Sequence, residues 1–199
     1  MMIRSGTELI NPFKVLERVG IRERMRIADL GCGSLGHFVF PAAQLAGPKG
    51  KIYAVDILRE VLEIIEHRAK DDQFYNIETI WSDIDVYRAT RIPEGGLDIC
   101  LLVNNLFLSQ NKPNLAKEMA RLIKKGGLAL VIDWKPSQTP IGPPADQRVS
   151  PEEAQAIFDI PEFSLTDTFE PGRFHYGLLF KRTDAQHVPP GGKKPHRRH

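Results

Sequence analysis

The amino-acid sequence predicts an α/β fold built on a doubly wound, mostly parallel sheet with an antiparallel hairpin at its C-terminal end. Between residues 25 and 134, short apolar runs alternate with amphipathic segments, as in parallel strands joined by right-handed helical crossovers. A glycine-rich turn joins the first apolar run to the first amphipathic segment. Strand-like runs at 163–169 and 174–182 are joined by only four residues, which forces antiparallel pairing.

The expected elements follow in order along the chain. A short helix covers 11–19, with Asn11 as N-cap, Pro12 in the first turn and Gly20 at the end. We then expect strands at 25–30, 51–55, 77–81, 97–103 and 128–134, and helices at 37–46, 58–69 and 114–124. The run 97–103 is almost continuously apolar, which is typical of a strand buried on both faces.

The C-terminal part begins with a proline-rich loop over 136–150. Ser150 and Glu153 form a capping-box pattern that starts a helix ending near Phe158. The hairpin strands follow, and the tail beyond them lacks apolar periodicity and is expected to be disordered. We therefore divide the chain into a helical segment (1–22), one α/β domain (23–182) and a basic tail (183–199).

Composition indicates a cytoplasmic globular protein. The 199 residues suffice for one stable domain, and 42% hydrophobic and 26% charged residues are ordinary for that class. No apolar run approaches the ~20 residues that span a bilayer, and the first residues lack a signal-peptide core. We expect no membrane association. Cys32 and Cys100 lie in apolar contexts, so we expect buried thiols and neither a disulfide nor a metal site.

The net charge of +2 comes from the tail, which carries four basic side chains and one acidic one. The rest of the chain has 23 basic and 24 acidic residues. Because the basic excess does not lie on the folded part, we expect no nucleic-acid partner.

The glycine-rich turn predicts a cofactor site. Gly31, Gly33 and Gly36 form a G-x-G-x-x-G pattern, in which glycine permits positive φ and close approach of a ligand to the backbone. Asp56 ends the next strand, 20 residues after Gly36, where a carboxylate can accept hydrogen bonds from two ribose hydroxyls. The pair predicts an adenosine-containing cofactor. The alternative is a tight turn and an unrelated surface aspartate.

Asp29 precedes the first glycine by two residues, and the sequence here resembles the class I S-adenosylmethionine-dependent methyltransferases. The resemblance implies a Rossmann-like, seven-stranded sheet with S-adenosylmethionine as cofactor. It implies that Asp29 helps to place the methionine end of the cofactor and that Asp56 holds the ribose. It also brings the turn residues Gly31, Cys32 and Gly33 into the cofactor-binding set.

Further cofactor contacts follow from the resemblance and from the rule that ligands bind at the carboxyl ends of parallel strands. Asp83 would accept from the adenine amino group, with Ser82 beside it and Ile84 and Ile57 against the adenine ring. The alternative for Asp83 is the N-cap of a short helix. Asn104 lies where the family's fourth motif meets the methyl group and the methionine amine.

The acceptor end resembles the small-molecule, ubiquinone/menaquinone methyltransferase-like group (methyltransferase types 11 and 31), as 124–128 and 132–135 match its fifth strand. We therefore expect a small-molecule acceptor. The tetrapeptide 104–107, Asn-Asn-Leu-Phe, does not support methylation of amino groups of bases or glutamine. Phe107 and Leu108 stand where quinone enzymes usually have a histidine, so the sequence does not specify a quinone.

Methyl transfer from a sulfonium requires alignment of the acceptor, and a base only where the acceptor must lose a proton. His175 and Lys135 are the catalytic candidates for that role or for binding an anionic acceptor, with His37 and Tyr176 behind them. Each has a packing or solvated alternative.

Three functions remain open at this point: a methyltransferase, another adenosyl-cofactor enzyme (an aminopropyltransferase or a nicotinamide-dependent enzyme), and a non-catalytic partner subunit of the same fold. Asp29 and the terminal hairpin disfavour the nicotinamide-dependent enzyme.

Overall fold

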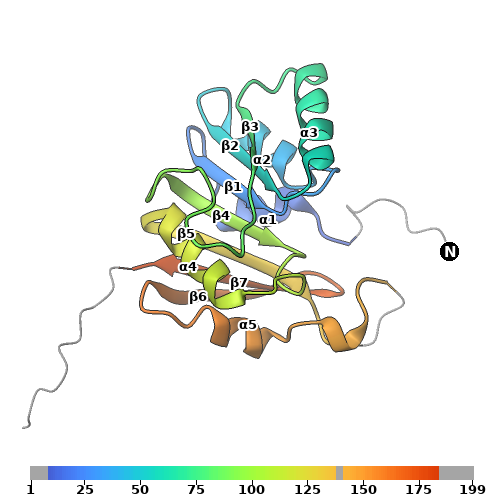
Figure 1. Ribbon diagram of the computed structural model, residues 1–199, viewed down its shortest axis with the longest axis vertical. Coiled ribbons are helices and arrows are strands. Elements are labelled where there is room, and N and C mark those ends of the chain that lie inside the picture. Colours follow the sequence, from blue (N-terminus) through green and yellow to red (C-terminus); the bar gives the residue numbers. More distant parts are fainter. Residues whose placement is uncertain (1–8, 138–140, 184–199) are drawn as a thin grey trace, which may run out of the picture.

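The computed structural model describes residues 9–137 and 141–183, and its centre is one seven-stranded sheet (Figure 1). The strand order is β3-β2-β1-β4-β5-β7-β6. The strands are β1 (Arg26–Leu30), β2 (Lys51–Asp56), β3 (Ile77–Trp81), β4 (Leu97–Val103), β5 (Ile123–Trp134), β6 (Phe163–Gly172) and β7 (His175–Arg182). The helices are α1 (Pro12–Val19), α2 (Val39–Ala46), α3 (Arg59–Asp71), α4 (Lys112–Leu122) and α5 (Pro151–Ile157), with a 3₁₀ turn at Ala145–Gln147.

The pairing confirms the predicted topology. Strands β1 to β5 pair in parallel, while β7 pairs antiparallel with both β5 and β6. Strand β6 therefore runs in the same direction as the first five, and β7 alone is reversed. The order changes direction between β1 and β4, which is the switch point where open α/β sheets bind ligands.

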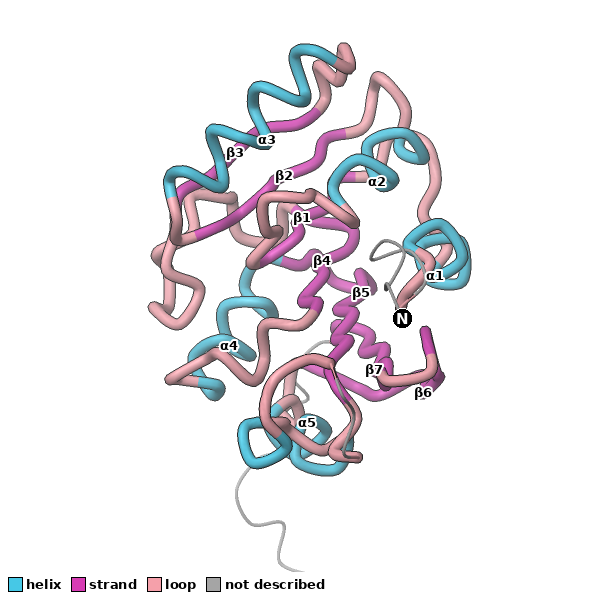
Figure 2. The backbone as a smooth tube through the Cα atoms, turned by 90° about the vertical axis from the view of Figure 1, so that its right-hand side faces the viewer, coloured by secondary structure: helices cyan, strands magenta, loops and turns pink. Residues whose placement is uncertain are grey.

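Helices cover both faces of the sheet (Figure 2). Each face has its own core of buried apolar side chains. Because side chains alternate along a strand, Ile27 packs beneath α1, α2 and α3, whereas Ala28 and Leu30 pack toward α4 and α5. Strands β1, β2 and β4 and residues 128–134 of β5 are largely buried on both faces, as their apolar runs predict, whereas the edge strand β3 keeps Glu78 and Trp81 exposed. No helix in the described residues is long and apolar enough to cross a membrane.

Local capping explains several helix boundaries. Asn11 accepts from the Lys14 amide at 3.1 Å, and Gly20 ends α1 in the left-handed region at φ +81°. The capping box of Ser150 and Glu153 is present at the start of α5. The two cysteines are buried and carry free thiols. These features are as the sequence predicted.

Several boundaries differ from the sequence-based expectation, and for two of them the structure shows the cause. Strand β5 begins at Ile123, which pairs with Leu97, so residue 124, where the sequence predicts the helix to end, and residues 125–127 lie inside the strand beside a register shift. Helix α4 begins at Lys112, since Asn111 accepts from the Asn114 amide and caps it. The expected disorder of the basic tail falls, from residue 184, outside the described residues.

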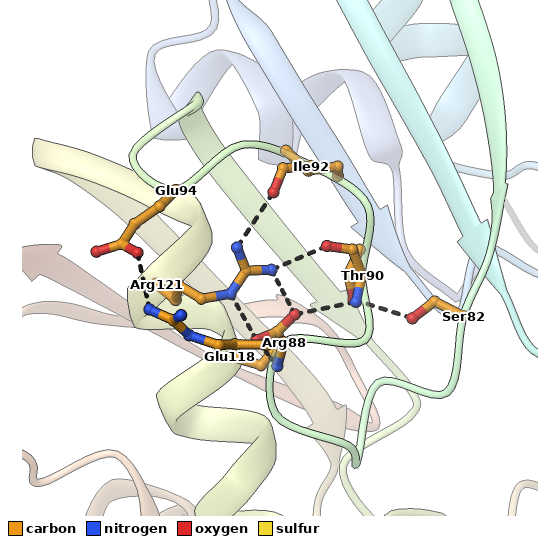
Figure 3. Close-up of polar contacts among 7 residues, drawn as sticks. All are labelled: Ser82, Arg88, Thr90, Ile92, Glu94, Glu118 and Arg121. Atoms are coloured by element: carbon orange, nitrogen blue, oxygen red, sulfur yellow. Dashed lines mark hydrogen bonds and ion pairs between the residues drawn. The ribbon is translucent and has the colours of Figure 1, made fainter.

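A buried ion pair on α4 fastens the long loop that follows β3 (Figure 3). The Glu118 carboxylate is fully buried and accepts from the Arg121 guanidinium at 2.6 Å. It also accepts from the backbone amides of Arg88 at 2.8 Å and Thr90 at 3.2 Å. Arg121 in turn donates to the carbonyls of Thr90 and Ile92. One helix face therefore satisfies the backbone of a loop that has no regular structure of its own.

Burial by itself would raise the pKa of Glu118, but the hydrogen bonds from Arg121 and from the loop amides hold it below its ordinary value. A carboxyl whose folded-state pKa is lowered stabilises the fold above its unfolded-state pKa. The contribution of Glu118 is therefore present at neutral pH and is lost as the pH falls.

We expect Glu118→Ala to cost about 3–5 kcal/mol of unfolding free energy, because it leaves Arg121 buried and two loop amides without their acceptor. Urea denaturation at pH 7 measures the change. Glu94→Ala is the control, since Glu94 pairs with Arg88 on the exposed surface, and it should cost at most about 1 kcal/mol. Equal costs for the two variants would contradict the assigned role of Glu118.

Candidate cofactor-binding site

The glycine-rich turn is built against the end of β2. The amides of Gly31 and Cys32 both donate to the Val55 carbonyl, at 2.8 and 3.1 Å. Gly31, Gly33 and Gly36 all have positive φ, from +54° to +74°, a region that glycine enters without steric cost. The sequence pattern therefore reports a real backbone requirement at this turn.

Asp56 joins the turn to the next loop. Its Oδ2 accepts from the Gly33 amide at 3.1 Å and its Oδ1 from the Leu58 amide at 3.0 Å. The residue is 8% exposed, and each carboxylate oxygen keeps a further lone pair. The two signals that the sequence placed 20 residues apart are thus in direct contact.

A cavity of about 280 Å³ opens beside this contact at the carboxyl edge of the sheet. Six residues from the predicted cofactor set line it: Gly31, Asp56, Ile57, Ser82, Asp83 and Ile84. Five residues that sequence reasoning did not include also line it: Asp85, Asn105, Leu108, Ser109 and Gln110. The structure thus brings together the loops after β1, β2, β3 and β4.

All the charged side chains that line the cavity are negative. Three carboxylates, those of Asp56, Asp83 and Asp85, line it, and none of its lining residues is Lys, Arg or His. Such a lining favours a ligand with positive charge and disfavours phosphate groups. The described residues hold no cluster of three or more His, Cys, Asp or Glu that is arranged for a metal ion.

Asp29 lies beneath the turn and is 3% exposed. Burial, and then the charge of Asp56, raise the pKa of Asp29 from 3.8 to about 7. Burial, and then the charges of Asp29 and Asp56, raise the pKa of the Cys32 thiol, so it stays protonated at neutral pH. Cys32 is therefore an apolar element of the turn and not a nucleophile.

Asp83 shapes the loop after β3. Its Oδ1 accepts from the Asp85 amide at 2.9 Å, which is an aspartate turn. No helix follows Asp83 in the described loop, so the helix-cap alternative does not apply. Its second oxygen takes no part in that turn.

Asn104, which the sequence predicts as a cofactor contact, does not line the cavity, whereas its neighbour Asn105 does. Asn104 has φ +56°, and its buried Oδ1 has no hydrogen-bond partner among the described residues. Asn105 lines the cavity, and its Nδ2 donates to the carbonyls of Gly31 and Val103, both at 2.8 Å. The left-handed turn at Asn104 redirects the chain, and spacing alone carries no sign of it.

Asp133 holds the start of the same loop from β5. The carboxylate is fully buried and accepts from the Phe107 amide at 3.2 Å and from the Trp134 amide at 2.7 Å. Burial raises the pKa of Asp133 to about 6, although these hydrogen bonds oppose the rise.

The catalytic candidates lie away from the cavity. His175 is fully buried, with its ring 4.1 Å from that of Trp134 and both ring nitrogens without a partner in the described part of the chain. Burial, and then the positive charges of Arg148 and Lys135, lower the pKa of His175 to about 4, so the ring is neutral. Its catalytic role stays a prediction.

Lys135 lines a different groove, between α5 and the hairpin, and its Nζ pairs with Glu170 at 2.7 Å. Tyr176 lines the same groove, with a buried hydroxyl that has no partner among described residues. His37 donates to the Ile10 carbonyl at 3.0 Å, which ties the segment before α1 to the glycine-rich turn.

Gly31 and Gly33 offer a matched test of the turn. Alanine at positive φ costs about 1–2 kcal/mol, and this applies to both positions. A Cβ on Gly33 meets open space, whereas one on Gly31 would collide with the Asn105 carboxamide. We expect Gly31→Ala to cost about 1–3 kcal/mol more than Gly33→Ala in urea denaturation. Similar costs would show that Asn105 does not pack on Gly31.

Asp29 gives a pH-dependent prediction. Because its folded-state pKa lies above its ordinary value, its contribution to stability falls as the pH rises from about 4 to 7. We expect Asn at this position, which cannot ionise, to avoid the loss. The gain in melting temperature of Asp29→Asn over the wild type should grow from pH 5 to pH 8. A difference that is constant with pH would place the Asp29 carboxyl in water.

Comparisons with known proteins agree on one family. The family model described as "Methyltransferase domain" matches residues 21–162. A demethylmenaquinone methyltransferase of Lactococcus lactis is 27% identical over 128 residues, which are 64% of this chain and 49% of that protein. The ubiquinone/menaquinone biosynthesis C-methyltransferase UbiE of Hahella chejuensis is 24% identical over 127 residues, 63% of this chain and 49% of that protein. The chain thus spans about half the length of these curated relatives.

Solved structures extend the likeness over the whole domain. An S-adenosylmethionine-dependent methyltransferase from Aquifex aeolicus superposes with a TM-score of 0.84 at 24% identity, covering 91% of this chain and 94% of that one, which shows the shared fold. A structure described as a type 11 methyltransferase from Sulfolobus solfataricus has a TM-score of 0.72 at 26% identity, covering 96% and 99%. Since the family model spans well over half of the chain, this protein belongs to the methyltransferase-domain family.

Proposed function

We propose that this protein transfers a methyl group from S-adenosylmethionine to a small-molecule acceptor. The observation that carries the proposal is the acid-lined cavity beside the glycine-rich turn, at the switch point of a methyltransferase-family fold. S-adenosylmethionine bears a sulfonium and an ammonium group, so the charge of this cavity suits it.

The residues present fit that cofactor. In our proposal Asp56 holds the ribose, Asp83 accepts from the adenine amino group, and Ile57 and Ile84 flank the ring. Asp29 supports the methionine end from beneath the turn.

The proposal also keeps the remaining members of the cofactor set. Gly31, Cys32 and Gly33 supply the turn backbone, Ser82 lines the cavity, and Asn104 belongs to the loop at the methyl end. Asn105, and not Asn104, lines the cavity. Asn104 is therefore kept in the proposed cofactor-binding set only because of the resemblance to the family.

The chemistry asked of the protein is limited. When bound, the cofactor supplies an electrophilic methyl group, so the chain has to bind, orient and desolvate the acceptor. No His, Lys, Tyr or Cys lines the cavity in the described residues. An acceptor that must lose a proton would need a base from the hairpin side, where His175 and Lys135 remain the proposed candidates.

A nicotinamide cofactor fits less well. Its pyrophosphate would place two negative charges in a cavity with three carboxylates and no basic side chain among its lining residues. This charge pattern favours the sulfonium cofactor over the dinucleotide independently of Asp29.

The acceptor class rests on the relatives and on charge. Relatives named for demethylmenaquinone and ubiquinone/menaquinone act on small molecules, which supports a small-molecule acceptor. The body of the chain has no basic excess, which supports no nucleic-acid partner. We further propose a cytoplasmic protein without membrane association, with 23–182 as the catalytic domain after a helical segment at 1–22.

Thermal shift tests the cofactor. We expect S-adenosylhomocysteine to raise the melting temperature, because a ligand that binds only the folded state stabilises it. NAD at the same concentration should leave the melting temperature unchanged. A rise with NAD and none with S-adenosylhomocysteine would overturn the proposal.

Asp56→Ala tests the ribose contact in the same protein. Two lost hydrogen bonds should weaken S-adenosylhomocysteine binding at least about tenfold by calorimetry. Asp98→Ala is the control, because Asp98 bonds the Arg26 amide at the opposite edge of the sheet. Unchanged affinity in Asp56→Ala would remove Asp56 from the site.

A further inference from the structure

Asp85 connects two loops that enter the cavity from distant strands. Its Oδ1 accepts from the Ser109 hydroxyl at 2.6 Å. Its Oδ2 accepts from the amides of Gln110 at 2.6 Å and Asn111 at 3.2 Å. The carboxylate therefore reaches from the loop after β3 to the loop after β4.

This contact spans a gap that the sheet itself does not close. Strands β3 and β4 are separated by β2 and β1, which is three strand spacings or roughly 14 Å. No ladder of backbone hydrogen bonds can join the two loops, so their separation depends on side chains. Both loops line the cavity, one with Ser82 to Asp85 and the other with Asn105 and Leu108 to Gln110.

Each of the two loops is also held in place by hydrogen bonds other than those of Asp85. Asp83 accepts from the Asp85 amide, which orients Asp85, and Ser82 contacts the Thr90 hydroxyl at 3.1 Å. On the other side, Asn111 caps α4, the helix whose Glu118 holds the Thr90 amide. Asp85 thus completes a closed ring of contacts around one side of the cavity.

The carboxylate has little capacity left for a ligand. A carboxylate oxygen has two lone pairs, and both acceptor positions of Oδ2 are taken. Oδ1 already accepts a short hydrogen bond from a hydroxyl. Three of the four acceptor positions of Asp85 are therefore filled by the protein, and only one lone pair on Oδ1 is left.

We propose that Asp85 is a positioning residue that holds the two walls of the cavity at the separation an adenosyl cofactor requires, acting through Ser109, Gln110 and Asn111. This inference rests on the proposed function. In this proposal Asp85 fixes the distance between the two loops that form the cavity walls, whereas Asp56 and Asp83 face the cofactor.

The test is a double-mutant cycle read by calorimetric binding of S-adenosylhomocysteine. Asp85→Asn keeps the size of the side chain but turns an amide group toward donors, so the Kd should rise at least about tenfold. Ser109→Ala removes one contact and should raise the Kd by about threefold. Since the two residues act as a unit, the effect of Asp85→Asn should be smaller in the Ser109→Ala background.

Asp98→Asn is the matched control, because Asp98 also accepts from a backbone amide but at the far edge of the sheet. Its Kd should stay within about twofold of the wild type. Melting temperatures of all variants, and hydrogen exchange of residues 105–111, separate wall movement from global unfolding. We expect faster exchange of these amides in Asp85→Asn in a protein that remains folded.

The outcomes are distinct. If the wild type does not bind S-adenosylhomocysteine, the proposed function fails. If the wild type binds it and Asp85→Asn binds equally well, the positioning role alone is overturned. Additive effects in the cycle would also overturn it, since they would mean that Asp85 does not act through Ser109. If Asp85→Asn does not fold, Ser109→Ala decides, and an unchanged Kd in that variant counts against the proposal.

Discussion

The contact between the glycine-rich turn and the end of β2 is the interaction on which the site depends. Three backbone amides in a row donate hydrogen bonds there. Those of Gly31 and Cys32 donate to the Val55 carbonyl, and that of Gly33 donates to the Asp56 carboxylate. This arrangement is possible only with left-handed backbone at the glycines. It closes the turn over Asp29 and raises the pKa of that carboxyl.

Carboxylates organise the loops that connect the strands. Asp85, Asp133 and Glu118 each accept backbone amides from a loop without regular secondary structure. Buried amides need partners, and a carboxylate can satisfy several at once. The protein thus replaces missing helix or ladder hydrogen bonds with acids. Of these three acids only Asp85 lines the cavity, where it adds to the negative charge of Asp56 and Asp83. The same charge then suits a sulfonium cofactor.

The hairpin side is built differently. Trp134 and His175 face each other across the β5–β7 pair, and Arg148 lies 5.7 Å over the Trp134 ring. This packing excludes water from His175 and keeps its ring neutral. The sequence proposed His175 as a catalytic candidate, but it could not show that neighbours distant in the chain would bury the ring.

The sequence by itself determined the features that depend on local rules. The order of the apolar runs along the chain predicted a doubly wound, mostly parallel sheet with an antiparallel hairpin. Capping residues predicted the ends of α1 and the start of α5. The glycines and Asp56 predicted where the cavity lies. Only the tertiary structure decided that Asn105, Asp85 and Ser109 line it, and that β5 begins at Ile123. The lining depends on loops from strands that are not neighbours in the sheet and on a left-handed residue at Asn104, which no periodic pattern encodes. The start of β5 depends on the pairing of Ile123 with Leu97 of β4.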